Sequence, residues 1–374
     1  MQRRLALLLF LGLELLLVSA LGSRSWANPP GVYPPEADLQ QLPDGAWTWV
    51  VFPDTQYYVD HTRVIPPSPE IFQSMVDWTI SQRDSRRVRL VLHVGDIVDN
   101  DTVPEWTMAK RILSRFDGQL PYAFALGNHD YAENASRRET RANSFLRSTD
   151  NPLNDPQQGG ILLETMEPDR LENTVYRFLA PDGRRLLVLA LEWGVRDRVL
   201  EWANRVMGRP ENQDVTAVLL CHAYLYHDNT WYDWESKGAS QAGNPHSYGT
   251  ASTGDTNDGR QIWQKLVRRH KAFQLVLCGH VSGSIEERYA LGDKSEVGYL
   301  RSVGDQGNVV HQLLFNAQRR GDSGEGWLRL LEFQPDGQSV IIKTFSPWLQ
   351  QRKLASWRSD EDDYFHIQLT PTVR

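Results

Sequence analysis

The chain has 374 residues, enough for one large domain or two ordinary ones, and its 40% hydrophobic residues, with 13 Trp, provide for a substantial core. Its formal net charge of −7, without any run of five or more basic residues, argues against nonspecific binding to a nucleic-acid polymer. Two cysteines, Cys221 and Cys278, are too few for a disulfide framework.

The N-terminal segment has the pattern of a secretory signal peptide. MQRR gives a basic start, LALLLFLGLELLLVSAL follows as an apolar stretch, and Ser25 and Ala27 are small residues at the −3 and −1 positions of a cleavage site. The alternative, an N-terminal membrane anchor, is disfavoured by Glu14. We therefore expect residues 1–27 to be removed and the mature protein to be periplasmic or extracellular, without stable membrane insertion. Loss of three Arg and one Glu would take the net charge to −9.

After a proline-rich, acidic leader at residues 28–45, strands and helices alternate along the chain. The apolar runs predict strands at 47–52, 88–94, 122–126, 215–220 and 273–278. Helical spacing predicts helices at 70–84, 105–116, 133–147, 195–207 and 259–270. Hairpins are expected at 173–192 and 327–345, a long loop at 148–172, and a last strand at 363–369.

This order predicts an α/β fold, a sandwich of two mixed β-sheets flanked by helices. We expect one domain over residues 46–348 and a C-terminal extension over 349–374. Cys221 and Cys278 lie within apolar strands, so we expect buried core residues, although a single disulfide between neighbouring strands stays open.

Polar clusters begin where the central strands stop. They are Asp54-Thr55-Gln56, Gly95-Asp96-Ile97-Val98-Asp99-Asn100, Gly127-Asn128-His129-Asp130, His222 and Gly279-His280. Ligands bind at the carboxyl edge of open α/β sheets, so these side chains are expected to meet at one rim. Alone, each cluster has a structural explanation, such as a turn for GNHD. Together, the oxygen and imidazole donors suit Mn, Fe, Zn or mixed divalent sites.

The ordered set D-x-(H/Q), G-D-x-x-D-N, G-N-H-D, H and G-H, over residues 47–283, resembles the calcineurin-like metallophosphoesterase superfamily. The resemblance implies two divalent metal ions that share Asp96. The first would be held by Asp54, Gln56 and Asp96, and the second by Asp96, Asn128, His222 and His280. It also implies hydrolysis of P–O bonds by a metal-bound hydroxide.

The same resemblance implies catalytic roles for His129 and Asp99. His129 would face the substrate and protonate the leaving oxygen, while Asp99 would accept its other ring proton and fix the tautomer. The alternative for Asp99 is a turn or helix cap.

Two positions depart from the usual family pattern. Gln56 stands where the first motif usually has His, and Ser282 stands where GHxH has its second His. Both changes weaken the first metal position, so we expect one tight and one weaker ion. A substitute ligand could lie among Asp305, Gln306, His311, Asn316 and Gln318. His311 attracts most interest, although a structural role is favoured for it.

An aromatic, polar insert occupies residues 224–258, directly after His222. Its length fits a substrate wall or an aromatic-pinned surface loop equally well. As a wall, it would stack Tyr224, Tyr226, His227, Trp231 and Tyr232 on a base or sugar.

The sequence therefore predicts an exported dinuclear-metal phosphoesterase acting on a small molecule. Its substrate would be a phosphodiester or nucleotide-like compound, or a phosphomonoester. The GDxxDN motif lacks the Arg-Gly of protein Ser/Thr phosphatases. The alternative is a noncatalytic exported binding protein with a degenerate metal site. Natural substrate and oligomeric state stay open.

Overall fold

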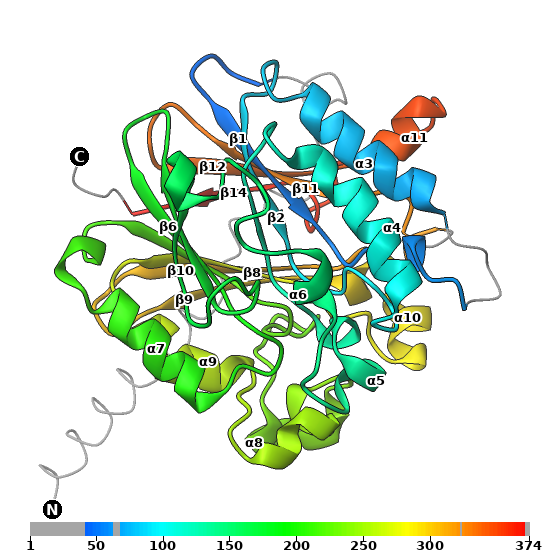
Figure 1. Cartoon of the computed structure of the whole chain (residues 1–374), viewed down its shortest axis with the longest axis vertical. Coiled ribbons are helices and arrows are strands. Elements are labelled where there is room, and N and C mark those ends of the chain that lie inside the picture. Colours follow the sequence, from blue (N-terminus) through cyan, green and yellow to red (C-terminus); the bar gives the residue numbers. More distant parts are fainter. Residues whose placement is uncertain (1–41, 63–67, 322–323, 371–374) are drawn as a thin grey trace, which may run out of the picture.

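Two seven-stranded mixed sheets pack face to face in the computed structural model, which describes residues 42–62, 68–321 and 324–370 (Figure 1). Helices cover the outer faces of both sheets (Figure 1). The fold is therefore the α/β sandwich expected from the sequence. The predicted signal peptide and most of the predicted leader lie outside the described residues.

The first sheet combines a parallel half with an antiparallel half. Its order is β13 (Trp357–Arg358), β12 (Ser339–Phe345), β11 (Leu328–Phe333), β1 (Trp47–Phe52), β2 (Val88–His93) and β3 (Tyr122–Phe124), with β14 (Phe365–Gln368) also paired to β12. Strands β1, β2 and β3 run parallel, whereas β11 pairs antiparallel with both β1 and β12. The carboxyl ends of β1, β2 and β3 therefore meet at one edge.

The second sheet has the same mixed character. Its order is β4 (Leu162–Thr165), β5 (Thr174–Leu179), β6 (Arg185–Ala190), β7 (Thr216–Leu220), β8 (Phe273–Cys278), β10 (Val309–Phe315) and β9 (Val297–Val303). Strands β6, β7, β8 and β10 are parallel neighbours, and β9 returns antiparallel along β10.

Two pairs of helices flank the sandwich on opposite sides. In Figure 1, α3 (Pro69–Ser81) and α4 (Val103–Leu113) cover the first sheet, while α7 (Asp197–Met207) and α9 (Gly259–Lys265) cover the second. Among the described residues, the remaining α-helices are α5 (Ala132–Ala135), α6 (Ala142–Phe145), α8 (Trp234–Lys237), α10 (Ile285–Leu291) and α11 (Pro347–Gln351). Pro69 fits the first helical position of α3 because no intrahelical partner is lost there.

The core between the sheets follows the alternation of side chains along β1. Trp47, Trp49 and Val51 pack between the sheets, whereas Val50 and Phe52 join the core under the helices. Trp47 stacks on Phe333 with ring centroids 4.0 Å apart. Because β1 is buried on both faces, it holds the loop at its carboxyl end firmly in place.

Most predicted elements are found. The strands at 47–52, 88–94, 122–126, 215–220 and 273–278 are β1, β2, β3, β7 and β8, and the two hairpins are β5–β6 and β11–β12. The last strand is β14, which joins the first sheet. Cys221 and Cys278 are free and buried, which confirms the core interpretation.

The helix predicted at 133–147 is wrong. Glu133, Asn134 and Ala135 have φ of 52°, 52° and 53°, so the chain turns left-handed instead of continuing a right-handed helix. Only the short helices α5 and α6 remain there. The loop predicted at 148–172 contains β4, and β9 was not predicted; both are edge strands with weak apolar alternation.

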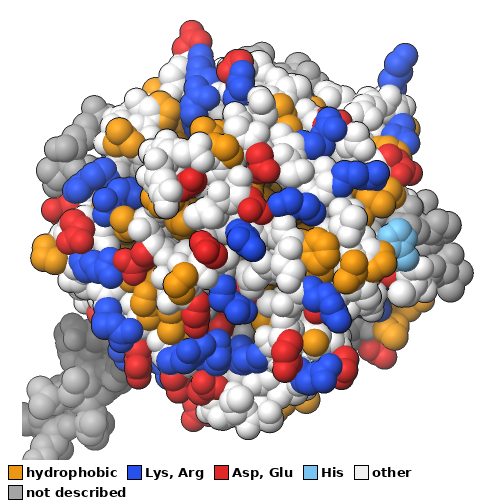
Figure 2. All heavy atoms as spheres, in the orientation of Figure 1, with side chains coloured by type: hydrophobic (Ala, Val, Ile, Leu, Met, Phe, Trp, Pro, Cys, Tyr) orange, Lys and Arg blue, Asp and Glu red, His pale blue; other side chains and the backbone are white. Residues whose placement is uncertain are grey.

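Basic and acidic side chains are interspersed over the face seen in Figure 2. Within the described residues, no helix combines the length and the apolar character needed to cross a membrane.

Candidate metal centre

The predicted site residues meet where the carboxyl edges of the two sheets adjoin. Asp54 follows β1, Asp96 follows β2 and Asn128 follows β3, while His222 follows β7 and His280 follows β8. The first four are at most 2% exposed. Parallel strands end at a common edge, and this places five distant segments around one point.

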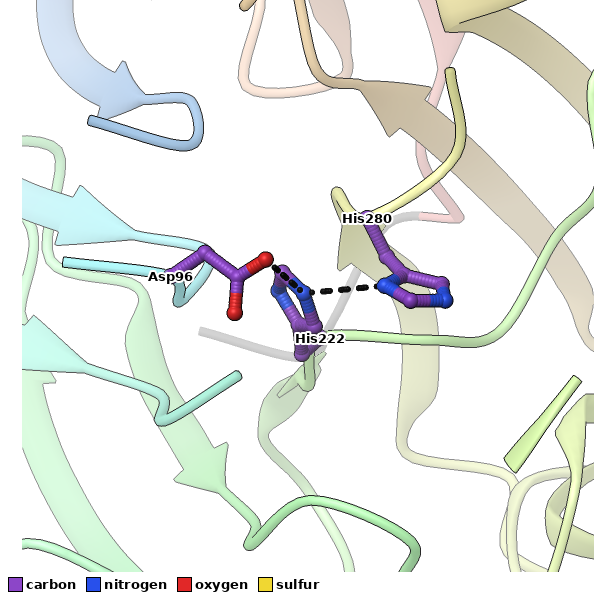
Figure 3. A group of neighbouring side chains, drawn as sticks. All are labelled: Asp96, His222 and His280. Atoms are coloured by element: carbon purple, nitrogen blue, oxygen red, sulfur yellow. Dashed lines mark hydrogen bonds and ion pairs between the residues drawn. The ribbon is translucent and has the colours of Figure 1, made fainter. Parts of the chain in front are cut away.

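Two imidazoles face each other at the centre (Figure 3). The Nδ1 of His222 lies 2.8 Å from the Val94 carbonyl oxygen, and the Nε2 of His280 lies 2.8 Å from the Gly243 carbonyl oxygen. A carbonyl oxygen only accepts, so each of these nitrogens carries the ring proton. In the neutral imidazoles, which are the forms that bind a metal ion, the remaining nitrogens, His222 Nε2 and His280 Nδ1, present lone pairs, and they lie only 3.2 Å apart.

The carboxylate of Asp96 points at the same place. Its Oδ2 lies 3.0 Å from His222 Nε2, and ligand atoms of Asp96, His222 and His280 all lie within 4.8 Å of one another. Two imidazole lone pairs and a carboxylate oxygen repel unless a cation lies between them. This donor set fits a divalent metal ion.

Negative charge is concentrated beside this group. His280 N donates to both carboxylate oxygens of Asp54, at 3.2 and 3.1 Å. Burial, and then the neighbouring Asp96, raise the pKa of Asp54 well above its ordinary value. Burial also disfavours the charged form of Asp96, but His222 and His129 outweigh it and lower the pKa of Asp96. A cation would relieve the repulsion between these two buried carboxylates.

Two amide oxygens from the predicted ligands, Gln56 and Asn128, add to the donor set. Gln56 Nε2 donates to Asp96 Oδ2 at 3.3 Å, and Asn128 Nδ2 donates to Asn134 Oδ1. Gln56 Oε1 and Asn128 Oδ1 are buried, yet neither accepts a hydrogen bond from the described part of the chain. Each such orphan costs about 1–3 kcal/mol, unless a ligand satisfies it. The left-handed turn that replaces the predicted helix brings Asn134 to Asn128.

Two motif glycines make this convergence sterically feasible. A Cβ at Gly127 would overlap Asp96, and a Cβ at Gly279 would overlap Asp54 and lie 2.5 Å from Val94 Cγ2. The glycines of GNHD and GH are therefore required for close approach of one loop to the carboxylate of another.

His129 lines a cavity of about 150 Å³ beside Asp96 and His280. Its Nδ1 donates to the main-chain carbonyl oxygen of Asp99 at 2.7 Å, and lies 3.4 Å from the Asp99 carboxylate. Asp99 thus contacts His129 more closely through its main-chain carbonyl oxygen than through the carboxylate that was expected to accept the proton, and the catalytic roles of both residues stay predictions. Burial lowers the pKa of His129, but Asp96 and Asp99 outweigh it, so the net shift is upward.

Two positioning residues were missed from the sequence. Asp130 is fully buried and accepts from Ile97 N, Val98 N and Gly127 N at 2.8, 3.0 and 2.8 Å, which ties the loops after β2 and β3 together. Trp193 packs on both His222 and His280, with ring centroids 5.8 and 5.0 Å away. The position of Asp130 directly after Gly127-Asn128-His129 could have indicated its role, whereas no sequence pattern around Trp193 indicates that it contacts the two histidines.

The insert at residues 224–258 lines one side of the cavity, and most of its aromatic residues anchor it to the rest of the fold. Tyr224 donates to Gln312, Trp231 donates to Gln312, and His227 pairs with Glu287, so these three pack into the fold. Tyr226 is likewise buried. Of the five aromatic side chains expected to stack on a substrate, only Tyr232 lines the cavity, together with Gly243 and Tyr248 of the same insert.

His311 does not reach the metal centre. Its Nε2 lies 2.8 Å from the Gln368 carbonyl oxygen and its Nδ1 lies 2.7 Å from the Tyr299 hydroxyl, next to β14. The favoured structural role is therefore confirmed. Asp305 and Gln306 lie in the turn before β10, at the opposite end of that strand from the cavity. Only Gln318, of the five candidate substitute ligands, lines the cavity.

Comparison with known proteins agrees with this geometry. A family model described as calcineurin-like phosphoesterase matches residues 51–283. The uncharacterized protein YvnB of Bacillus subtilis (strain 168) is 24% identical over 321 residues, which are 85% of this chain. The match covers 21% of YvnB, so the chain spans about a fifth of that relative.

Among solved structures, the purple acid phosphatase PPD1 of yellow lupin (Lupinus luteus) superposes with a TM-score of 0.48 and 13% identity, over 93% of this chain and 58% of that one. The NAD nucleotidase NadN of Haemophilus influenzae gives a TM-score of 0.42 and 13% identity, over 86% of this chain and 50% of that one.

Proposed function

The chain belongs to the calcineurin-like phosphoesterase family, and from this premise we propose that it hydrolyses a phosphate ester bond with two divalent metal ions. The observation that carries the proposal is the convergence of Asp96 with the two bare imidazole nitrogens of His222 and His280. When bound there, two such ions polarise the phosphoryl oxygens and lower the pKa of a coordinated water toward neutrality. Asp54, Gln56 and Asp96 would hold the first ion, and Asp96, Asn128, His222 and His280 the second.

His129 is the proposed general acid. Its Nδ1 proton is engaged by the Asp99 carbonyl oxygen, so the ring edge that carries Nε2 is the one available to the cavity. An imidazolium at this position can give the Nε2 proton to the leaving oxygen as the P–O bond breaks. The water oxygen ends on phosphorus and the neutral imidazole is re-protonated from solvent.

The cavity rim supports an anionic substrate. Arg319 is exposed there, with its guanidinium 5.5 Å from the Tyr57 ring centroid and its Nε donating to Ser282 Oγ at 3.2 Å. A guanidinium held in this way can bind non-bridging phosphoryl oxygens in bidentate fashion. Tyr248 is half-buried at the cavity and offers an aromatic face for the alcohol or nucleoside part, whereas Tyr232 is fully buried. We propose a small phosphodiester or nucleotide-like substrate, or a phosphomonoester; export stays a prediction from residues 1–27.

The test is an assay with p-nitrophenyl phosphate and bis-p-nitrophenyl phosphate, with Mn²⁺, Zn²⁺ or Fe²⁺ added. We expect His129→Ala to lower kcat by about 10²–10⁴-fold. His366→Ala is the matched control, because His366 is exposed on β14. Metal removal by a chelator should abolish activity and metal addition should restore it. A folded, metal-loaded protein that turns over neither ester would contradict the proposal and favour the noncatalytic binding protein.

A further inference from the structure

Gln318 lines the cavity beside Asp96, and no family motif marks it. We propose that Gln318 supplies its amide oxygen to the first metal ion, in place of the imidazole that Ser282 does not provide. This inference rests on the proposed function, because it names a further ligand of the same metal centre.

Sheet register brings Gln318 to the position of the missing histidine. Strands β8 and β10 are parallel neighbours, and Cys278 pairs with Leu314. Four residues beyond this pair, the two segments reach Ser282 and Gln318. The hydrogen bond from Arg319 Nε to Ser282 Oγ joins the same two segments, and both Ser282 and Gln318 line the cavity beside Asp96.

The backbone before Gln318 is held in an unusual conformation. Ala317 is buried and has φ of 60°, a left-handed conformation that is unfavourable for a non-glycine residue. Asn316 Oδ1 accepts from Gln318 N at 3.0 Å and closes the turn. Asp96 and His280, two of the proposed ligands, also have positive φ, of 51° and 75°. The three loops that reach the centre from β2, β8 and β10 thus share this feature.

The amide oxygen of Gln318, like the amide oxygens of Gln56 and Asn128, is buried without a hydrogen-bond donor from the described part of the chain. Gln318 is 6% exposed, and its Oε1 is buried without a hydrogen-bond partner among the residues that the structure describes. Gln56 Oε1 and Asn128 Oδ1 share this condition. Amide carbonyl oxygens are good ligands for hard divalent cations, so coordination would satisfy an otherwise costly group.

The added ligand gives the two positions different chemistry. All donors of the first ion would be oxygen atoms, from Asp54, Gln56, Asp96 and Gln318. The second ion would also bind the imidazole nitrogens of His222 and His280. Oxygen donors suit Mg²⁺ and Mn²⁺, and imidazole suits Zn²⁺ and Fe²⁺. We therefore expect two unlike ions, a hard one that exchanges easily and a tightly held imidazole-bound one.

The experiment is a calorimetric Mn²⁺ titration of full-length, chelator-treated protein, with bound metal counted by elemental analysis. Gln318→Leu should weaken one of two Mn²⁺ sites at least tenfold and leave the other unchanged. Gln306→Leu is the matched control, because Gln306 is exposed at the opposite end of β10. Adding Ser282→His to Gln318→Leu should restore the lost site, since it returns the imidazole of the family pattern.

Wild-type affinities at both sites in Gln318→Leu would overturn the proposal, as would failure of Ser282→His to restore binding. If Gln318→Leu does not fold by circular dichroism, Gln318→Glu decides instead: a charged oxygen at a metal ligand should tighten the weaker site, and unchanged affinity refutes ligation. These readouts do not need turnover. If Gln318→Leu loses one Mn²⁺ ion but the wild-type protein hydrolyses no phosphate ester, the proposed function is refuted and the assignment of Gln318 as a metal ligand stands.

Discussion

Gly127→Ala tests whether the loops after β2 and β3 must touch for the centre to form. Gly127 has φ of −97° and ψ of −177°, a conformation open to alanine, so the substitution adds no backbone strain. The new methyl group would instead meet the loop after β2. Its Cβ would lie 2.5 Å from Asp96 N and 2.7 Å from Asp96 Cγ.

The size of the effect follows from this overlap. Ordinary contacts begin at 3.4 Å, so Asp96 N must retreat by about 0.9 Å. The carboxylate cannot swing away freely, because His129 N donates to Asp96 Oδ1 at 2.9 Å. Overpacking of this kind costs about 1–3 kcal/mol of unfolding free energy. A displacement near 1 Å of a catalytic group lowers the rate about 10²-fold.

The assay compares kcat/KM for p-nitrophenyl phosphate, Mn²⁺ affinity and urea stability between wild type and variant. We expect Gly127→Ala to stay folded, to lose about 10²-fold in kcat/KM and to bind Mn²⁺ more weakly. Gly298→Ala is the control, because its Cβ would have no neighbour closer than 3.3 Å. Wild-type kinetics and metal affinity in Gly127→Ala would show that Asp96 is not the shared ligand.

Two further predictions concern histidines. Asp99→Asn keeps the main-chain carbonyl oxygen that accepts from His129 Nδ1, so we expect a smaller loss of kcat than for His129→Ala. It removes a negative charge near the imidazole, so the basic limb of the pH–rate profile should move to lower pH. Equal losses of kcat in the two variants would mean that the Asp99 carboxylate orients His129. Burial lowers the pKa of His311 from 6.5 to about 4, so the unfolded chain binds the extra proton first. The free energy of unfolding should therefore fall by up to about 3 kcal/mol as the pH drops from 6.5 to 4, measured by urea denaturation. His311→Gln should flatten this slope, and an unchanged slope contradicts the assignment.

Much of the site could be predicted from the sequence because its residues follow buried strands. Asp54, Asp96, Asn128, His222 and His280 each come directly after an apolar run, and parallel strands share an edge. Spacing along the chain therefore carried spatial information for them. The helix predicted at 133–147 was wrong because the polar spacing of this segment does not distinguish a helix from the left-handed turn that the φ values of Glu133, Asn134 and Ala135 show.

The sequence by itself determined the α/β class, the strands that end at the centre, and the residues offered there as ligands. Only the tertiary structure decided which groups lie close together: the carbonyl oxygen of Asp99 is nearer to His129 than its carboxylate is, Tyr232 and Tyr248 are the aromatic residues of the insert beside the cavity, and Gln318 rather than His311 lines the cavity with Ser282. Local pattern specifies which face of a strand is buried, because side chains alternate with period two. It does not specify where a loop turns or which strand becomes a neighbour, because both depend on packing between segments far apart in the chain.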